Sequence, residues 1–181
     1  AAYGQAERWR RAWESHAERT WFEVPWYFAE AYFYRRLLEA VRYFEPGRWE
    51  GHDPFGPQKS VQIDHAVEGL EALRPTLADL GPRDCLNALV LASLWSNRAD
   101  LSNLTVDVGA LGTGSAGGER HNLLIDDTDA ACERLMAADH VAFLCDNVGA
   151  DSLHDLALAD HLLVQGWASQ VTLHLKAHPF F

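Results

Sequence analysis

The chain has 181 residues, of which 48% are hydrophobic and 23% are charged, and it carries a formal net charge of −11. This composition is that of an ordinary globular protein and excludes a disordered, collagen-like or coiled-coil chain. The negative charge argues against general binding to nucleic acid, because the phosphates would be repelled. The apolar stretches are too short for a membrane span, so we expect no membrane partner. No secretory signal is visible and the three cysteines are widely spaced, so we expect a cytoplasmic protein.

Residues 1–103 are expected to form a helical region. Trp9 and Trp13 recur at helical spacing, which predicts an amphipathic helix over residues 5–20. A second helix over 26–44 follows a proline and is apolar nearly all round, so we expect it to be buried. Further helices are expected over 60–73 and 85–95, after a proline- and glycine-rich loop at 46–57, with Asp84 as the N-cap of the last.

Residues 104–181 are expected to form an α/β region. A short apolar run over 141–145 fits a strand that is buried on both faces. Together with a helix over 152–165 and a strand over 171–176 it predicts a βαβ unit with parallel strands. A strand-like run at 123–125 and a helix over 129–138, capped by Asp127 or Thr128, precede this unit. The predicted fold class is therefore α/β, a helical N-terminal region followed by a three-layer α/β/α core.

Asp146 and Asn147 directly follow the strand predicted over 141–145, at its carboxyl end, where open α/β sheets bind their ligands. Carboxylate and amide oxygens suit Mg²⁺ or Mn²⁺. The N-terminus of the next helix would favour an anion, such as a substrate phosphate, beside that cation. The alternative is a strand-to-helix turn without a ligand, because Asp, Asn and Gly are the ordinary residues of such turns.

Asp151 and Asp155 lie four residues apart, so they share one helical face. There they could contact the metal ligands without binding the metal themselves. The run from Ser152 to Asp155 also fits a capping box, and we favour capping as the role of Asp155. The expected core face of the same helix consists of Leu156, Ala159 and Leu163.

The candidates for substrate binding are Asn97, Arg98, Asp100, Glu30 and Lys176. The cluster around Arg98 either ends the helix before it or lets the guanidinium hold a phosphate. For Glu30 and Arg35 we favour a buried ion pair with each other over a role in holding the substrate. Lys176 is one of only two lysines, and at a strand end it can either meet a phosphate or extend its ammonium into water.

Four segments, taken in order, resemble the metal-dependent damage-control phosphatases, in the subgroup that includes the acidic-residue methyltransferase. They are VPWYFAEAYFYRR (24–36), LWSNRADLS (94–102), DNVGAD (146–151) and HLKAHPFF (174–181). The resemblance implies a helical N-terminal region, an α/β/α core and removal of phosphate from phosphorylated metabolites such as sugar phosphates. It also implies a divalent cation (Mn, Mg, Co or Ni) bound by Asp146 and Asn147, which would carry the catalysis, and a pocket near Asn97, Asp100 and Glu30.

The family continues beyond the last of these segments and supplies a third metal ligand there. We therefore expect the chain to be a fragment that lacks the C-terminal part and is weakly active or inactive by itself. One alternative is an S-adenosylmethionine-dependent protein carboxyl methyltransferase, but the Gly-rich run 112–117 lacks the strand and helix of a dinucleotide site. The other is a non-catalytic binding module, which the missing ligand favours.

Overall fold

The structure, a computed structural model, describes residues 2–96, 120 and 123–180, and these fall into two compact units. Unit 1 contains the described residues up to Gly56 and those from His178 onward, and unit 2 contains those between Pro57 and Ala177. The boundary predicted at residues 103–104 lies outside the described residues.

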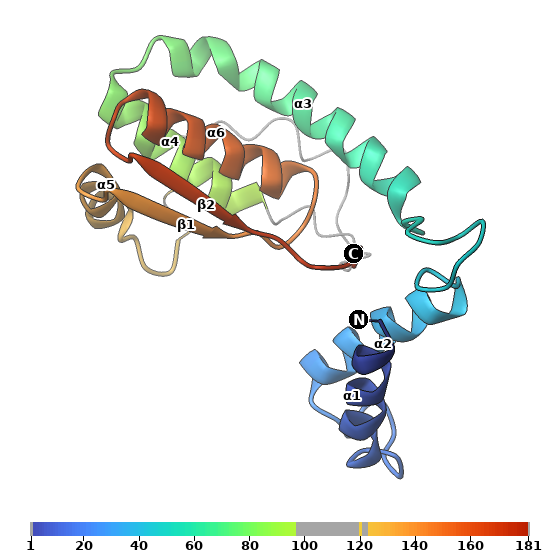
Figure 1. The fold of residues 1–181 in the computed structure, drawn as a ribbon. Helices are drawn as coiled ribbons and strands as arrows, with labels where there is room; N and C mark the ends of the chain where they lie inside the picture. Colours follow the sequence, from blue (N-terminus) through green and yellow to red (C-terminus); the bar gives the residue numbers. More distant parts are fainter. Residues whose placement is uncertain (1, 97–119, 121–122, 181) are drawn as a thin grey trace. The chain divides into compact units, whose positions relative to one another are not determined.

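Unit 1 is built on the helices α1 (Ala2–Glu14) and α2 (Trp26–Ala40) (Figure 1). The predicted face of α1 is confirmed, because its tryptophans pack on aromatic residues of α2. Trp13 stacks on Tyr32 with the ring centroids 4.7 Å apart. The segment after Ala177 also joins this unit, where the rings of Phe180 and Tyr34 stack with centroids 5.8 Å apart.

Helix α2 is shorter and more exposed than predicted. It ends at Ala40 and not at residue 44, and Arg42 in the following turns has a positive φ of 60°. Trp26 and Tyr27 are about three-quarters exposed, so the prediction of a buried helix is wrong. A helix packed against one other helix buries only one stripe of its surface, and the remaining aromatic side chains of α2 stay in contact with solvent.

Unit 2 contains four helices among the described residues. They are α3 (Gly56–Ala78, whose first residue belongs to unit 1), α4 (Pro82–Ser96), α5 (Thr128–Met136) and α6 (Ala150–Val164). Helix α4 begins with Pro82, which puts Asp84 in its first turn and not at the predicted N-cap. No described helix is both long and apolar enough to span a membrane.

The predicted βαβ unit is confirmed. β1 (His140–Leu144) and β2 (Gln170–His174) are parallel, with Val141 opposite Val171, and α6 connects them. Helices α4 and α6 pack side by side against one face of this sheet (Figure 1). The core between these elements consists of Leu86, Leu89, Cys132, Leu158, Leu162 and Ala168, with Val141, Phe143 and Val171 of the strands packed against it. The chain is therefore an α/β protein with N-terminal helices.

Two local predictions are wrong. Alternate residues of β1 are exposed, Leu144 by 83%, so the strand is buried on one face and not on both. Residues 123–125 do not form a strand, and Leu124 and Ile125 are exposed. Within the described part of the chain, helices cover one face of a two-stranded sheet, and in β1 the alternate residues on the other face stay exposed.

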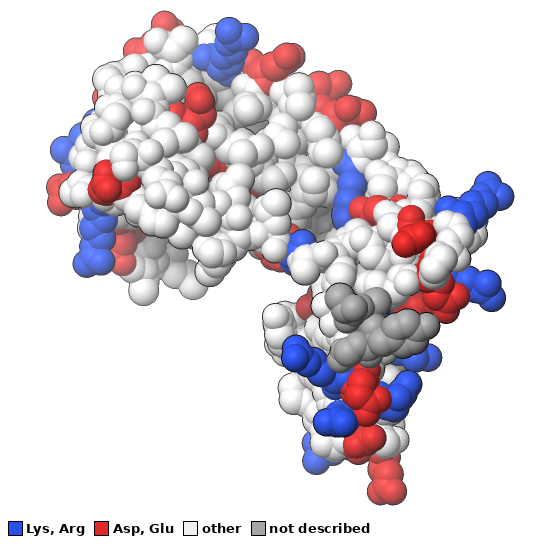
Figure 2. Space-filling model, viewed as in Figure 1, with Lys and Arg blue, Asp and Glu red and all other residues white. Residues whose placement is uncertain are grey.

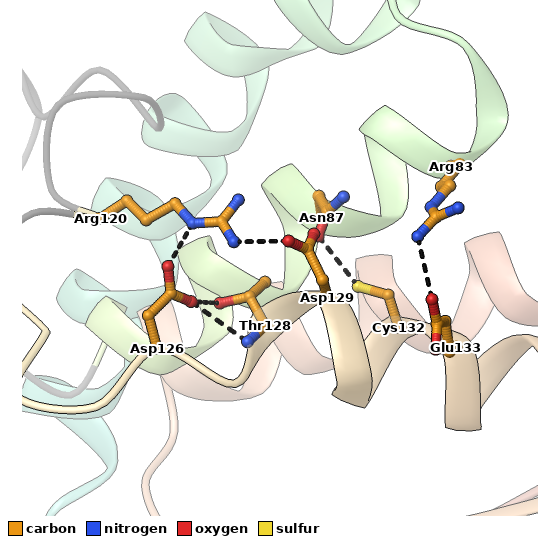
Figure 3. Close-up of polar contacts among 8 residues, drawn as sticks. All are labelled: Arg83, Asn87, Arg120, Asp126, Thr128, Asp129, Cys132 and Glu133. Atoms are coloured by element: carbon orange, nitrogen blue, oxygen red, sulfur yellow. Dashed lines mark hydrogen bonds and ion pairs between the residues drawn. The ribbon is translucent and has the colours of Figure 1, made fainter.

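The start of α5 is held by a carboxylate that the sequence analysis did not select (Figure 3). Asp126 accepts hydrogen bonds from Thr128, from the backbone N at 3.1 Å and from Oγ1 at 2.7 Å. Arg120 donates to both Asp126 and Asp129. Asp127 occupies the N-cap position without a side-chain bond, so the capping role predicted for Asp127 or Thr128 belongs to Asp126.

Candidate functional site

Asp146 and Asn147 lie in the turn between β1 and α6, at the carboxyl end of the strand. Because β1 and β2 are parallel, Lys176, two residues beyond β2, reaches the same edge of the sheet. Its Nζ lies 2.9 Å from Oδ1 of Asp146. The fold thus brings together three of the predicted site residues, and the Asp146 side chain remains 62% exposed and open to a ligand.

Gly149 shapes the turn. Its φ is +100°, a value that side-chain-bearing residues rarely adopt, and an added Cβ would lie 3.0 Å from Cβ of Gln62 on α3. Helix α6 begins directly after it, and the Ser152 hydroxyl accepts a hydrogen bond from the Gly149 backbone N at 3.1 Å. The capping box predicted between Ser152 and Asp155 is therefore wrong.

Asp151 and Asp155 lie on the side of α6 that packs against α4. The buried residues of α6 are Leu158, Ala159 and Leu162, which continue the same stripe, whereas Leu156 and Leu163 of the predicted core face are exposed. The Ser93 hydroxyl donates a hydrogen bond to Oδ1 of Asp155 at 2.6 Å. The Ser96 hydroxyl donates to Oδ1 of Asp151, also at 2.6 Å.

Asp151 is the most perturbed carboxyl group beside the turn. Burial raises its pKa above the ordinary value, hydrogen bonds from Ser96 and Asn147 oppose that shift, and the nearby charges of Asp146 and Asp155 add to it. Nδ2 of Asn147 donates a hydrogen bond to Oδ2 of Asp146 at 3.4 Å.

The donor set fits a hard divalent cation. The charges of Asp146 and Asp155 both act on Asp151 here, and Lys176 contributes one positive charge. Among the residues that the structure describes, no group of three or more His, Cys, Asp or Glu side chains is arranged to hold a metal. Mg²⁺ commonly takes one or two protein carboxylates and fills its other positions with water and phosphate, which Asp146 and the Asn147 oxygen can accommodate.

The other predicted substrate residues are not gathered here. Asn97, Arg98 and Asp100 lie outside the described residues, as does the Gly-rich run at 112–117. Glu30 is an exposed residue of unit 1. The ion pair predicted between Glu30 and Arg35 is wrong, because buried Arg35 pairs with Glu39 at 3.2 Å. Residues four apart face each other on a helix and residues five apart do not.

Ser93 and Ser96 were missed by the sequence analysis. They continue the buried stripe of α4 that Leu86 and Leu89 begin, and Ser96 is only 8% exposed. The available signal was two hydroxyl groups at helical spacing on an otherwise apolar stripe. Small polar residues on a buried helix face require a hydrogen-bonding partner, and here α6 supplies it.

Comparison with known proteins identifies the family of the chain. The profile of the Damage-control phosphatase ARMT1-like domain matches residues 2–181. The chain belongs to the ARMT1-like damage-control phosphatase family. Damage-control phosphatase ARMT1 of Danio rerio is 26% identical over 94% of the chain and 45% of its own length. The proteins of that name from Mus musculus and Homo sapiens are each 28% identical over 93% of the chain, and over 42% and 43% of their own lengths.

The chain therefore spans less than half the length of these curated ARMT1 relatives. The family match covers both units, including the aromatic helix α2 and the turn with Asp146 and Asn147. The resemblance stated from four sequence segments is thus confirmed for the family.

Proposed function

We propose that the protein containing this chain is a divalent-metal-dependent phosphatase acting on phosphorylated metabolites such as sugar phosphates. The observation that carries the proposal is the meeting of Asp146, Asn147 and Lys176 at the carboxyl edge of the parallel strands. Membership of the damage-control phosphatase family supports it independently. The proposed substrate is a small phosphate ester, and the proposed location is the cytoplasm.

In this proposal Asp146 and Asn147 hold the cation, which is Mn²⁺, Mg²⁺, Co²⁺ or Ni²⁺. When bound, such a cation neutralises charge on the phosphoryl oxygens and on the leaving oxygen. Lys176 exchanges the Asp146 carboxylate for a phosphate oxygen and so fixes the anionic end of the ester. Asn97, Arg98, Asp100 and Glu30 stay proposed substrate contacts, of which only Glu30 belongs to the described part of the chain.

The surface charge gives no support to a nucleic-acid partner. On the face shown in Figure 2, acidic and basic side chains are interspersed, and no broad basic area gathers there among the described residues. The whole chain is negatively charged. A phosphate backbone would therefore be repelled outside a local site, whereas a single phosphate group needs only the cation and one or two basic side chains.

The test compares the full-length protein with its Asp146→Ala variant in phosphate release from sugar phosphates and an aryl phosphate, with Mn²⁺ or with a chelator. We expect the chelator and Asp146→Ala each to abolish turnover, because both remove the cation. The exposed Asp64→Ala serves as the control and should retain it. Turnover that survives both treatments would overturn the proposal. Binding of S-adenosylmethionine, measured by calorimetry, would favour the methyltransferase instead.

A further inference from the structure

The segment that follows β2 is held on unit 1 through one histidine. Nε2 of His178 donates a hydrogen bond to Oε1 of Gln5 on α1, at 3.0 Å. The imidazole ring also meets the rings of Tyr43 and Phe44 nearly at right angles, with centroid distances of 6.1 and 5.1 Å. One half-buried side chain thus links this segment to α1 and to the turns after α2.

These contacts suit the neutral imidazole and not the protonated one. Because Oε1 of Gln5 only accepts hydrogen bonds, Nε2 of His178 carries the ring proton. Nδ1 is buried and has no hydrogen-bond partner among the described residues. A second proton would have to bind at Nδ1, where the new N–H group would lie without an acceptor. A buried donor of this kind costs free energy, and more so when the group is charged.

The charge nearest to this ring in the aromatic cluster is positive. The guanidinium of Arg35 is 2% exposed, and its Cζ lies 3.8 Å from the centroid of Phe44, the ring that His178 also contacts. Glu39 pairs with Arg35 at 3.2 Å and with Arg36 at 2.9 Å, so one carboxylate is shared between two guanidinium groups. Protonation would therefore add a positive charge beside one that is only partly neutralised.

The other groups packed on the imidazole bring no negative charge. Gln5 of α1 is an uncharged amide, and Tyr43 presents its ring. Within the described part of the chain, His178 forms no ion pair with a carboxylate. In agreement with this geometry, burial lowers the pKa of His178 below its ordinary value of 6.5, and the charge of Arg35 lowers it further.

We propose that His178 is a pH-sensitive attachment point of this segment. The neutral imidazole holds the segment from His178 to Phe180 on unit 1, and protonation at Nδ1 releases it. Because the attached histidine takes up a proton less readily than the released one, the attachment weakens as the pH falls below about 6.5. Histidine is the side chain whose charge ordinarily changes in this range, so mild acid is sufficient.

The test follows backbone hydrogen exchange of the full-length protein by mass spectrometry between about pH 8 and pH 5, with the intrinsic pH dependence of exchange divided out. We expect the protection of residues 177–180 to fall several-fold below about pH 6.5 while α4 and α6 keep theirs. His178→Phe keeps an aromatic ring that cannot gain a proton, so it should hold the segment at every pH. Gln5→Glu offers the protonated imidazole a carboxylate and should keep the segment attached in acid.

His52→Gln is the matched control. His52 is an exposed histidine of the same unit, so this variant should respond to pH as the wild type does. Protection of residues 177–180 that stays constant with pH in the wild type would overturn the inference. An equal fall in His178→Phe or in Gln5→Glu would do the same, since another group would then cause the release. These outcomes leave the phosphatase proposal unaffected, because it depends on Asp146 and Asn147.

Discussion

At the scale of single residues, Gly149 decides the shape of the candidate turn. The chain leaves β1, passes Asp146 and Asn147, and enters α6 through a backbone conformation with φ of +100°. An added Cβ would also lie only 3.0 Å from Cβ of Gln62 on α3, so Gln62 would have to shift. Two separate physical reasons, backbone sterics and packing, therefore favour glycine at this position.

We expect Gly149→Ala to lower the free energy of unfolding by about 1–3 kcal/mol, because the positive φ alone costs an alanine about 1 kcal/mol and the contact adds to it. Gly69→Ala is the matched control. Gly69 lies inside α3 with open space around it, so alanine there should stabilise the protein by about 0.5–1 kcal/mol. Chemical denaturation of both variants measures these changes. Equal effects of the two substitutions would contradict the requirement for glycine at 149.

At the scale of elements, the starts of two helices in unit 2 are fixed by hydrogen bonds at or close to the helix terminus. The start of α6 uses Ser152 and Gly149, and the start of α5 uses Asp126 with Arg120 (Figure 3). Hydrogen bonds from Thr128 and Arg120 lower the pKa of Asp126 from 3.8 to about 2. The folded state therefore favours the ionised form of this carboxyl group.

This lowered pKa makes the contribution of Asp126 to stability depend on pH. A carboxyl group with a lower pKa in the folded than in the unfolded state stabilises the fold above the unfolded value, near 4, and loses that effect as the pH falls to about 2. We expect Asp126→Asn to be less stable than the wild type at pH 7, with the difference shrinking below pH 4. Unfolding midpoints between pH 7 and pH 3 measure it. Asp127→Asn, whose side chain makes no capping bond, should show no such convergence.

At the scale of the whole molecule, the candidate site depends on residues that are 30 positions apart in the sequence. The parallel pairing of β1 with β2 places the ends of both strands at one edge, which brings Lys176 to Asp146. The ammonium group therefore stands where it competes with a cation for one carboxylate oxygen. It can release that oxygen when a phosphate arrives, since the phosphate offers a second anionic partner.

We expect Lys176→Met to raise the affinity for Mn²⁺ in the absence of substrate by about two- to five-fold, the worth of an exposed ion pair. The same variant should raise KM for a phosphate ester, because a contact to the anion is lost. Calorimetry and steady-state kinetics measure the two effects. Arg83→Met, which removes another exposed ion pair far from this turn, should change neither. A fall in Mn²⁺ affinity in Lys176→Met would contradict competition between the lysine and the cation.

The sequence by itself determined the features that depend on neighbouring residues. Apolar runs bounded by polar residues or glycine predicted β1, α6 and β2 and their parallel pairing, and polar residues after a strand predicted where Asp146 and Asn147 lie. Helical spacing likewise predicted an amphipathic helix with Trp9 and Trp13 on one face, and both rings pack on Tyr32. These patterns are local, because strand and helix periods and turn residues act within a few positions of one another.

Only the tertiary structure decided which faces meet. It showed that α6 turns Asp151 and Asp155 toward α4, that Ser93 and Ser96 receive them, and that Arg35 pairs with Glu39. The exposed face of β1 was equally invisible in the sequence, because an apolar run fits a strand with one or two covered faces. The face that a helix or strand buries is set by the surface that packs against it, and that surface comes from a distant part of the chain.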